Sequence, residues 1–180
     1  MTPLVSPNVR IRHPDLFEIG EHSIVDDFCY FSTRVRIGVC SHIASGCSIA
    51  GGRARQFTLG DYCSLSSGVK IWCTSDDFVN DVVAILPDGV GPIKEHLIEG
   101  DVSLADCTAV GSNSVVMPGN DIPEGTVIGA LSFVPARFRF EPWSVYAGVP
   151  IRLIGRRNHE AVTAQVRLIE RRLEALRHKA

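Results

Sequence analysis

The sequence has few of the features that mark nucleic-acid-binding, exported or membrane proteins. Its 20 acidic and 18 basic residues leave a net charge of −2, so no overall cationic field attracts a polyphosphate backbone. It has no long apolar run, and Met1 to Val5 lack the charged flank and apolar stretch of a signal sequence. We therefore expect one cytoplasmic domain that binds neither nucleic acid nor membrane.

The cysteines and histidines lack the spacing of a metal site. Six of each are present, yet no two cysteines form Cys-x-x-Cys and no two histidines form His-x4-His. Such spacings bring thiolate or imidazole ligands around a zinc ion. A chain of this length also has no need of a disulfide framework. We therefore expect free, mostly buried thiols and no metal ion.

Apolar side chains recur at every sixth position along most of the chain. The series has two interruptions and contains Ile19, Val25, Phe31, Ile37, Ile43 and Ile49, then Leu59, Leu65 and Ile71, then Ile98, Leu104, Val110, Val116, Ile122, Ile128 and Val134. A helix repeats every 3.6 residues and a strand every two, so neither produces this spacing. The sequence therefore predicts a repeat architecture.

Each six-residue unit also has a small or slender side chain four places after the bulky one. Cys29, Cys47 and Cys63 occupy this position, and serine or threonine does so in most other units. A short strand followed by a sharp turn fits one unit, and several units close one coil of a parallel β-helix. One coil cannot bury its apolar face alone, so coils stack at strand spacing, about 4.8 Å.

Three segments follow from this organisation. Residues 1–18 precede the first unit and are expected to form an irregular N-terminal cap. Residues 19–135 form the all-β parallel β-helix, interrupted by an inserted loop at 72–97 that is too long to be a turn. Residues 136–180 close the C-terminal end and include an amphipathic helix over 160–178. We expect this helix to cap the β-helix or to contact another subunit.

The C-terminal units add short motifs to the bare repeat. They read Val110-Gly111-Ser112-Asn113-Ser114-Val115-Val116-Met117-Pro118-Gly119, Ile122-Pro123-Glu124-Gly125-Thr126, Ile128-Gly129-Ala130 and Tyr146-Ala147-Gly148-Val149-Pro150-Ile151-Arg152. Together with the repeat, these motifs resemble the left-handed β-helix, hexapeptide-repeat acyltransferases, in particular the galactoside, maltose and sugar-nucleotide acetyltransferases. The resemblance covers roughly residues 19–157.

The resemblance implies a left-handed parallel β-helix and a homotrimer with each active site between two subunits. It also implies acetyl-CoA as the co-substrate along the C-terminal coils, without a metal. Small residues there would let backbone groups approach the pantetheine arm, and arginine forks suit the phosphates. The matching positions are Gly111, Ala130 and Ser132 along the arm, Gly148 and Pro150 closing over it, and Arg137, Arg152 and Arg156 among the basic residues.

The inserted loop departs from the galactoside and xenobiotic acetyltransferases, in which a loop at this point supplies a catalytic histidine. Here the stretch reads Ile71-Trp72-Cys73-Thr74-Ser75-Asp76-Asp77-Phe78 and has no histidine. A hydroxyl acceptor needs a base of near-neutral pKa. A neutral amine is already nucleophilic, so a carboxylate of ordinary pKa suffices to take its proton. We therefore expect Asp76 or Asp77 to serve an amine.

The neighbouring loop residues complete the expected substrate site. Trp72 is suited to stack on a sugar or a base. The Ser75-Asp76-Asp77-Phe78 element is similar to that of bacterial acetyltransferases in surface-polysaccharide (O-antigen) synthesis, some of which modify nucleotide-linked amino sugars. We assign Trp72, Ser75 and Phe78 to substrate binding, and we expect N-acetylation of a nucleotide-linked amino sugar.

Three other interpretations stay open. Asp76 and Asp77 could serve only to shape a turn. An O-acetyltransferase would use His96, or a histidine of a neighbouring subunit, as its base. A non-catalytic trimeric scaffold would keep the prism without turnover. Two further readings are set aside, because the carbonic anhydrases of this fold need three histidines around zinc and because Cys73 has no base nearby.

Overall fold

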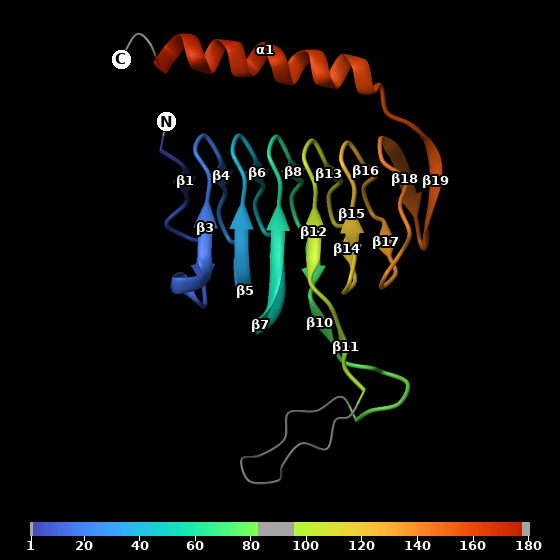
Figure 1. The fold of residues 1–180 in the computed structure, drawn as a ribbon. Helices are drawn as coiled ribbons and strands as arrows, with labels where there is room; N and C mark the ends of the chain where they lie inside the picture. The colour runs from blue at the N-terminus through green and yellow to red at the C-terminus, as the bar shows by residue number, and fades with distance from the viewer. Residues whose placement is uncertain (1, 83–95, 178–180) are drawn as a thin grey trace.

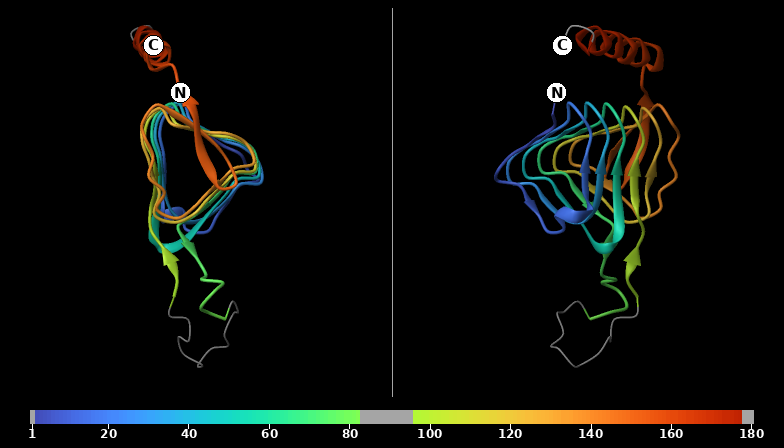
Figure 2. Two further views of the ribbon diagram at one scale, coloured as in Figure 1. Left: turned by 90° about the vertical axis from the view of Figure 1, so that its right-hand side faces the viewer. Right: turned by 60° about the vertical axis from the view of Figure 1, so that its left-hand side comes forward.

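The computed structural model describes residues 2–82 and 96–177, which form a three-sided solenoid with one helix above it (Figure 1). Seen along its axis, the chain traces a triangle, and successive coils lie almost on top of one another (Figure 2). Each side of the triangle is a sheet whose strands pair in parallel from coil to coil. The expected all-β parallel β-helix with a C-terminal helix is confirmed.

The three sides are called face A, face B and face C. Face A contains β1 (Leu4–Val5), β4 (Ile24–Val25), β6 (His42–Ile43), β8 (Ser64–Leu65), β13 (Ala109–Val110), β16 (Val127–Ile128) and β18 (Ser144–Gly148). Face B contains β2 (Arg10–Ile11), the first halves of β5 (Tyr30–Ile37) and β7 (Ser48–Leu59), β9 (Lys70–Trp72), β14 (Val115–Val116) and β17 (Phe133–Val134). Face C contains β3 (Phe17–Ile19), the second halves of β5 and β7, β12 (Val102–Leu104) and β15 (Asp121–Ile122).

The remaining elements leave this regular path. A 3-10 helix, η1 (Pro14–Leu16), precedes β3, and β10 (Thr74–Ser75) pairs in antiparallel fashion with β11 (Ile98–Glu99). After the last coil, β19 (Ile151–Arg156) turns back antiparallel to β18, and α1 (His159–Arg177) follows. These segments are free of the packing that fixes the coils, so they are the places where residues of a functional site are expected.

Bulky apolar side chains form continuous columns inside the prism. On face B, Phe31, Ile49 and Ile71 lie in register on successive coils, and all three are fully buried. Burial of each such side chain stabilises the fold by about 1.5–3 kcal/mol. The six-residue apolar line in the sequence is therefore the core itself.

The small side chains form hydrogen-bonded columns at the corners. The backbone N of Ser41 donates to Ser23 Oγ at 2.9 Å, and the backbone N of Cys63 donates to Ser41 Oγ at 2.9 Å. Each small hydroxyl thus satisfies a backbone donor of the next coil inside the dry corner. All six cysteines are free and five are buried, as expected.

The first coil begins earlier than the repeat predicts. Strand β1 pairs with β4, and β2 and β3 both pair with β5, all in parallel. Residues 4–18 are therefore not the irregular cap that was expected over 1–18. Val5 and Ile11 keep the six-residue spacing, but the segment containing η1 adds two residues before Ile19 and shifts the phase. A six-residue series counted back from Ile19 therefore does not reach Val5 and Ile11.

The six-residue line also includes one residue that is not in a core column. Ile98 pairs with Ser75 in the two-stranded sheet of β10 and β11 and is only half-buried. Leu104 continues face C instead, in register with Leu59 across the inserted loop. The spacing between Ile98 and Leu104 is therefore coincidental.

Aromatic rings, rather than the helix, cover the C-terminal end of the core. Phe138, Phe140 and Tyr146 meet edge to face, with ring centroids 4.9 to 5.7 Å apart. Helix α1 instead runs along the ridge between faces C and A, back toward the N-terminal coils (Figure 1). Of the two roles expected for α1, capping an end is wrong, because the helix lies lengthwise on the prism, and contact with another subunit stays a prediction.

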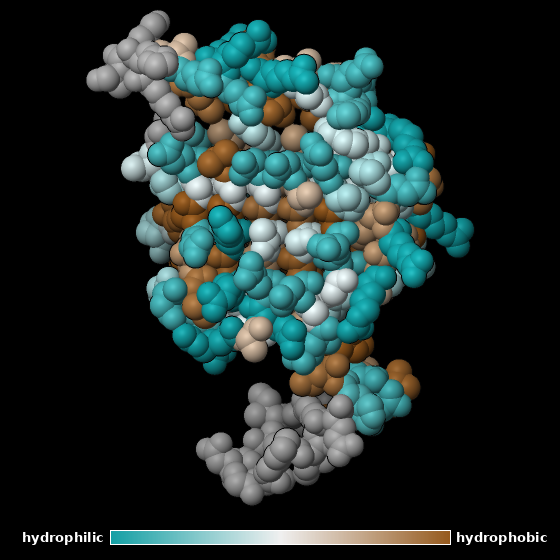
Figure 3. Space-filling model, in the orientation of Figure 1, coloured by the Kyte–Doolittle hydropathy of each residue, from teal (hydrophilic) through white to brown (hydrophobic). Residues whose placement is uncertain are grey.

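Helix α1 packs loosely on this ridge. The Trp143 ring stacks on His159, the first residue of α1, with centroids 4.0 Å apart. Farther along, apolar side chains show between the helix and the prism (Figure 3), and a cavity of about 350 Å³ lies between Tyr62 and Leu173. Within the described residues, no helix is long and apolar enough to cross a membrane.

Candidate functional site

The inserted loop leaves the prism through a narrow two-stranded neck. Register pairs Thr74 with Glu99 and Ser75 with Ile98, so the chain departs and returns side by side (Figure 1). Arginines from two different coils fix this neck. Arg55 Nη2 lies 3.3 Å from Glu99 Oε2, and Arg137 Nη2 donates to the Glu99 carbonyl at 2.9 Å. Arg137, expected at the CoA phosphates, therefore stands at the root of the loop.

Asp77 shapes a local turn. Its Oδ1 accepts hydrogen bonds from the backbone N of Val79 at 2.8 Å and of Asn80 at 3.3 Å, and its Oδ2 accepts from Asn80 Nδ2 at 2.6 Å. The side-chain bond from Asn80, followed by the backbone bonds, lowers the pKa of Asp77 below its usual range. A carboxylate with a lowered pKa is a weaker proton acceptor. This geometry favours the turn interpretation for Asp77.

Asp76 is placed differently from its neighbour. It follows β10 directly and is half-buried at the mouth of the neck, where Ser75 Oγ donates to the Asp76 carbonyl at 3.1 Å. Asp77 is engaged in its turn and has a lowered pKa, so Asp76 is the better candidate for chemistry of the two adjacent acids.

His96 and Asp81 form a pair that spans the loop. The backbone N of His96 donates to Asp81 Oδ2 at 2.7 Å, and His96 Nδ1 lies 3.1 Å from Asp81 Oδ1. The Asp81 side chain is 8% exposed, while that of His96 is 55% exposed. Sequence patterns could not indicate Asp81 as a partner of His96, because 15 residues separate the two and no periodicity relates them.

The aromatic residues of the loop differ in exposure. Trp72 ends β9 in register with Ala50 and is half-buried, whereas Phe78 is 76% exposed. Trp72, Ser75 and Asp76 thus lie within one short stretch at the base of the loop. Phe78 lies farther out, beside the turn that Asp77 forms.

A second group of predicted residues lies at the C-terminal coils, on the corner between faces A and B. A Cβ on Gly111 would come within 2.3 Å of the Ala130 backbone N, so these two residues stack directly. The backbone N of Gly148 continues the corner by donating to Ser132 Oγ at 3.2 Å. The corner is narrow and lined by small residues. A thin amide-bearing chain could approach the backbone there.

Ser132 does not have the position expected for a residue lining a ligand. Its side chain is only 2% exposed, and its Oγ donates to the Gly129 carbonyl at 2.7 Å inside the coil. The small position of the repeat points inward, so a contact of residue 132 with the CoA arm would have to use its backbone, and that contact stays a prediction. Its hydroxyl supports the corner that Gly148 occupies.

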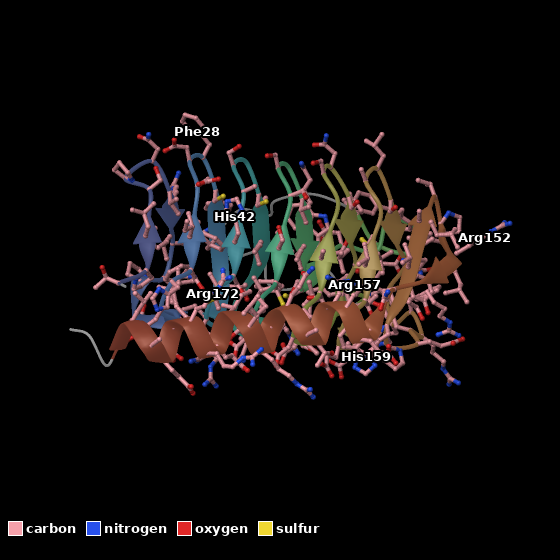
Figure 4. All side chains as sticks on the ribbon, turned by 90° about the horizontal axis from the view of Figure 1, so that it is seen from above. Phe28, His42, Arg152, Arg157, His159 and Arg172 are labelled. Atoms are coloured by element: carbon pink, nitrogen blue, oxygen red, sulfur yellow. The ribbon has the colours of Figure 1, made fainter. Side chains whose placement is uncertain are left out.

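The predicted basic residues do not form one cluster. Arg152 is exposed on β19 opposite Ala147 and projects from the C-terminal end (Figure 4), near Pro150 in the turn between β18 and β19. Arg156 is already paired with the Glu141 carboxylate, and its Nη1 donates to Ser144 Oγ at 2.7 Å. Arg152 is therefore the better placed of the two for a phosphate.

The chain is similar to known acyltransferases in sequence and in structure. No family model matches it. The dTDP-4-amino-4,6-dideoxy-D-glucose acyltransferase of Escherichia coli is 30% identical over 164 residues, which cover 86% of this chain and 82% of the relative. AntD, an N-acyltransferase from Bacillus cereus solved with dTDP and 3-hydroxybutyryl-CoA, superposes with a TM-score of 0.80 and 29% identity over 92% of this chain and 86% of that one.

The chain belongs to the left-handed β-helix hexapeptide-repeat acyltransferases. The predicted family and enzyme class are thereby confirmed. A hexapeptide-repeat acetyltransferase from Vibrio cholerae shares the fold at 19% identity, with a TM-score of 0.62 over 79% of this chain and 75% of that one.

Two other chemistries have no support in the described part of this acyltransferase. Residues 2–82 and 96–177 contain no group of three His, Cys, Asp or Glu side chains that could hold a metal ion. Cys73, beside the loop, is fully buried, and burial raises the pKa of its thiol to about 12. A thiol with so high a pKa supplies almost no thiolate at neutral pH, so it is a poor nucleophile.

Proposed function

We propose that the protein transfers an acetyl group from acetyl-CoA to the amino group of a nucleotide-linked amino sugar. The observation that carries this proposal is the base of the loop, where Asp76 stands next to Trp72 and Ser75 with no imidazole among these positions. The similarity to an acyltransferase of a dTDP-linked amino sugar, and to AntD with dTDP and an acyl-CoA, supports it.

Once the reactants are aligned, the reaction needs only one group of the protein to accept and return a proton. The neutral amine attacks the thioester carbonyl, a C–N bond forms, and the C–S bond breaks. The proton released by the nitrogen passes to the Asp76 carboxylate and from there to the departing sulfur, which leaves as the CoA thiol. Because the nitrogen becomes acidic only after attack, a carboxylate can accept its proton.

The acyl donor would lie along the small-residue corner of the C-terminal coils. Gly111, Ala130 and Gly148 provide the narrow wall, and Pro150 sits in the turn beside it. Arg152 would contribute a guanidinium fork to the phosphates at the exposed end. The donor then approaches the loop from the C-terminal side of the prism.

We place three copies of the chain around face A. The outward side chains of this face are mostly apolar or small, and they are Leu4, Ile24, His42, Ser64, Ala109, Val127 and Val145. Leu4 is 60% and Ile24 39% exposed. Face C instead presents charged Glu18, Arg36 and Asp121. In Figure 4, His42 lies on this side, between α1 and Phe28.

This arrangement would let a neighbouring copy complete each site, as in a homotrimer. Ala109→Arg and Val127→Glu place charges on face A, whereas Arg36→Glu changes face C and serves as the matched control. Sedimentation equilibrium should give a trimer for the wild type and the control, and monomers for the two face A variants. Trimers in all four would place the contact elsewhere.

The substrates also indicate where in the cell the reaction takes place. Acyl-CoA and nucleotide-linked sugars are both polar, charged metabolites that do not cross membranes unaided, so the reaction is assigned to the cytoplasm. Its product would be a building block for a surface polysaccharide such as O-antigen.

A sugar O-acetyltransferase is the second candidate, because His96 with Asp81 behind it has the geometry of an oriented base. The test is to incubate the protein with acetyl-CoA and a mixed panel of nucleotide-linked amino sugars and hydroxyl sugars, and to read the products by mass. Gain of one acetyl on amino sugars alone is expected. Acetylation of hydroxyl sugars alone would establish the second candidate. Absence of both transfer and acetyl-CoA binding would leave a non-catalytic scaffold.

A further inference from the structure

Two arginines lie beside an aromatic ring at the N-terminal coils, and a third borders them. We call Arg10, Arg12, Tyr30 and Arg53 the basic corner. Arg10 Cζ lies 5.9 Å from the centroid of the Tyr30 ring. The Arg12 guanidinium and the Ser32 hydroxyl beside the phenol lower the pKa of Tyr30 below its usual range. The phenol therefore lies in a local positive field.

Arg53 adds a third guanidinium from a different coil. Its Nη1 lies 3.2 Å from His13 Nδ1, and its Nη2 lies 2.7 Å from Asp15 Oδ2. His13 follows Arg12 in the chain, so Arg53 borders the group formed by Arg10 and Arg12. Strand β7 reaches this position because its 12 residues extend past the corner, whereas most strands on the other coils have two or three.

A nearby acid balances only part of the charge of the basic corner. Asp15 pairs with Arg53, but neither Arg10 nor Arg12 forms an ion pair with a carboxylate in the described part of the chain. Both arginines are exposed on a protein whose net charge is −2. A local excess of guanidinium groups around a half-buried aromatic ring is suited to an anion that also has a flat or apolar part.

The basic corner lies on the same face as the root of the loop. Register places Arg10, Tyr30, Ser48 and Lys70 in one row across successive coils of face B. Each coil advances by about 4.8 Å, so Tyr30 and Lys70 are about 10 Å apart along the prism. Trp72 follows Lys70 by two residues and begins the loop that contains Asp76. A hexose joined to two phosphates can bridge that gap.

We propose that the basic corner binds the diphosphate of the nucleotide-linked sugar, with the sugar pointing along face B toward Trp72 and Asp76. This inference rests on the proposed function and extends it. Arg10 and Arg12 would each bind a phosphate through paired N–H groups, and the Tyr30 ring would contact the nucleoside. The two substrates then enter from opposite ends of the prism, the acyl donor from the C-terminal coils and the sugar nucleotide from the N-terminal coils.

The test measures binding without requiring turnover. Titration calorimetry with dTDP, with inorganic pyrophosphate and with CoA is done on the wild type and on Arg10→Ala, Arg12→Ala and Tyr30→Phe. Arg36→Ala is the matched control, since it removes an exposed arginine from face C that pairs only weakly with Glu18, at 3.8 Å. A thermal melt of each variant confirms that it is folded.

Loss of either arginine should weaken dTDP and pyrophosphate binding by about tenfold or more, because charge-assisted bonds to phosphate are lost. CoA binding should be unchanged, and the slope of log Kd for dTDP against log salt should become flatter. Tyr30→Phe should retain most of the dTDP affinity if the ring makes the contact. The Arg36→Ala control should match the wild type in every titration.

Equal dTDP affinity in the wild type and in both arginine variants would overturn the proposal. Equal weakening of dTDP and CoA binding would overturn it too, because the loss would then reflect a general change of surface charge. If dTDP binds and depends on Arg10 and Arg12 but no amino sugar is acylated, the basic corner stands and the proposed function fails. The two proposals are thus tested separately.

Discussion

Asp81 binds His96 through both oxygens of its carboxylate, one to the backbone N at 2.7 Å and one to Nδ1 at 3.1 Å. A carboxylate only accepts hydrogen bonds, so the contact assigns the ring proton of neutral His96 to Nδ1 and makes Nε2 the basic nitrogen. The same contact joins the outgoing and returning segments of the loop, beyond the pairing of β10 with β11. The pair therefore has either a chemical role or a structural one.

Substitution of His96 distinguishes these roles. With an amino sugar as acceptor, His96→Ala should lower kcat/KM by less than about tenfold, because a neutral amine needs no imidazole base. Its pH–rate profile should keep the shape of the wild-type profile. A loss of about 10²- to 10⁴-fold, with disappearance of an inflection between about pH 6 and 7, would instead make His96 the base. Asp81→Asn should then follow His96→Ala in both measurements.

The two adjacent acids of the loop should respond differently to the same substitution. Asp76→Asn should lower kcat by about 10²-fold or more, because the amide cannot accept the proton of the attacking amine. Asp77→Asn is the matched control and should stay close to the wild-type rate, since asparagine also forms this kind of turn. The measurement is the steady-state kcat of the wild type and of both variants, with the product detected by mass. An unchanged rate for Asp76→Asn would remove it from the mechanism.

Close stacking of the coils makes Gly111 sensitive to a single methyl group. The added Cβ would lie 2.3 Å from the Ala130 backbone N, a contact that the rigid coil cannot relieve. Gly111→Ala should destabilise the fold by about 1–3 kcal/mol, as overpacking does. At Gly155, nothing lies within 4 Å of the added Cβ, so Gly155→Ala should change stability by less than about 1 kcal/mol. Urea unfolding of both variants provides the comparison.

Stability in acid should depend on Asp27, which ties the first coil to the second. Ser6 Oγ and Asn8 Nδ2 donate to Asp27 Oδ1, and the Ser6 bond, then the Asn8 bond, lowers the pKa of this carboxyl. The unfolded chain then binds the proton more readily than the folded one, so stability rises with pH. This contribution is complete above the unfolded pKa of about 3.9 and is lost as pH falls through the lower folded value.

The corresponding measurement is the melting temperature of the wild type and of Asp27→Asn in buffers from about pH 5 down to about pH 2. The variant should show a flatter profile, because asparagine has no proton to gain. Parallel profiles for the two proteins would mean that other carboxylates account for the acid response.

The sequence predicts the scaffold well because one physical requirement is repeated in every coil. Phe31 and Ile49 fill the same column and are 18 residues apart, which is three six-residue units. Ile71 joins this column 22 residues after Ile49, because the extended strand β7 lengthens that coil. The prediction fails where the chain leaves the repeat. Val5 and Ile11 were missed because a short insertion shifts the phase, and Ile98 fits the spacing without occupying the core.

The site was less predictable, since it depends on contacts between segments that no period relates. The turn at Asp77 is local, and aspartate in a loop already indicates it. The Asp81 contact with His96 and the attachment of Glu99 to Arg55 and Arg137 join distant positions, so only the three-dimensional structure reveals them. The inward position of the Ser132 side chain follows from the repeat, and its assignment to the CoA arm rests on the resemblance alone.

The register of Leu59 with Leu104 has an evolutionary consequence. Although 44 residues separate these two leucines, their strands pair in the same register as strands of neighbouring coils without an insertion. The inserted loop therefore does not set the register of the scaffold. A longer, shorter or unrelated loop could therefore be grafted at β10 and β11 while the scaffold remains intact. In the proposed function this loop binds the acceptor, so exchange of one segment would change acceptor preference, and lineages would acquire new substrates on an unchanged fold.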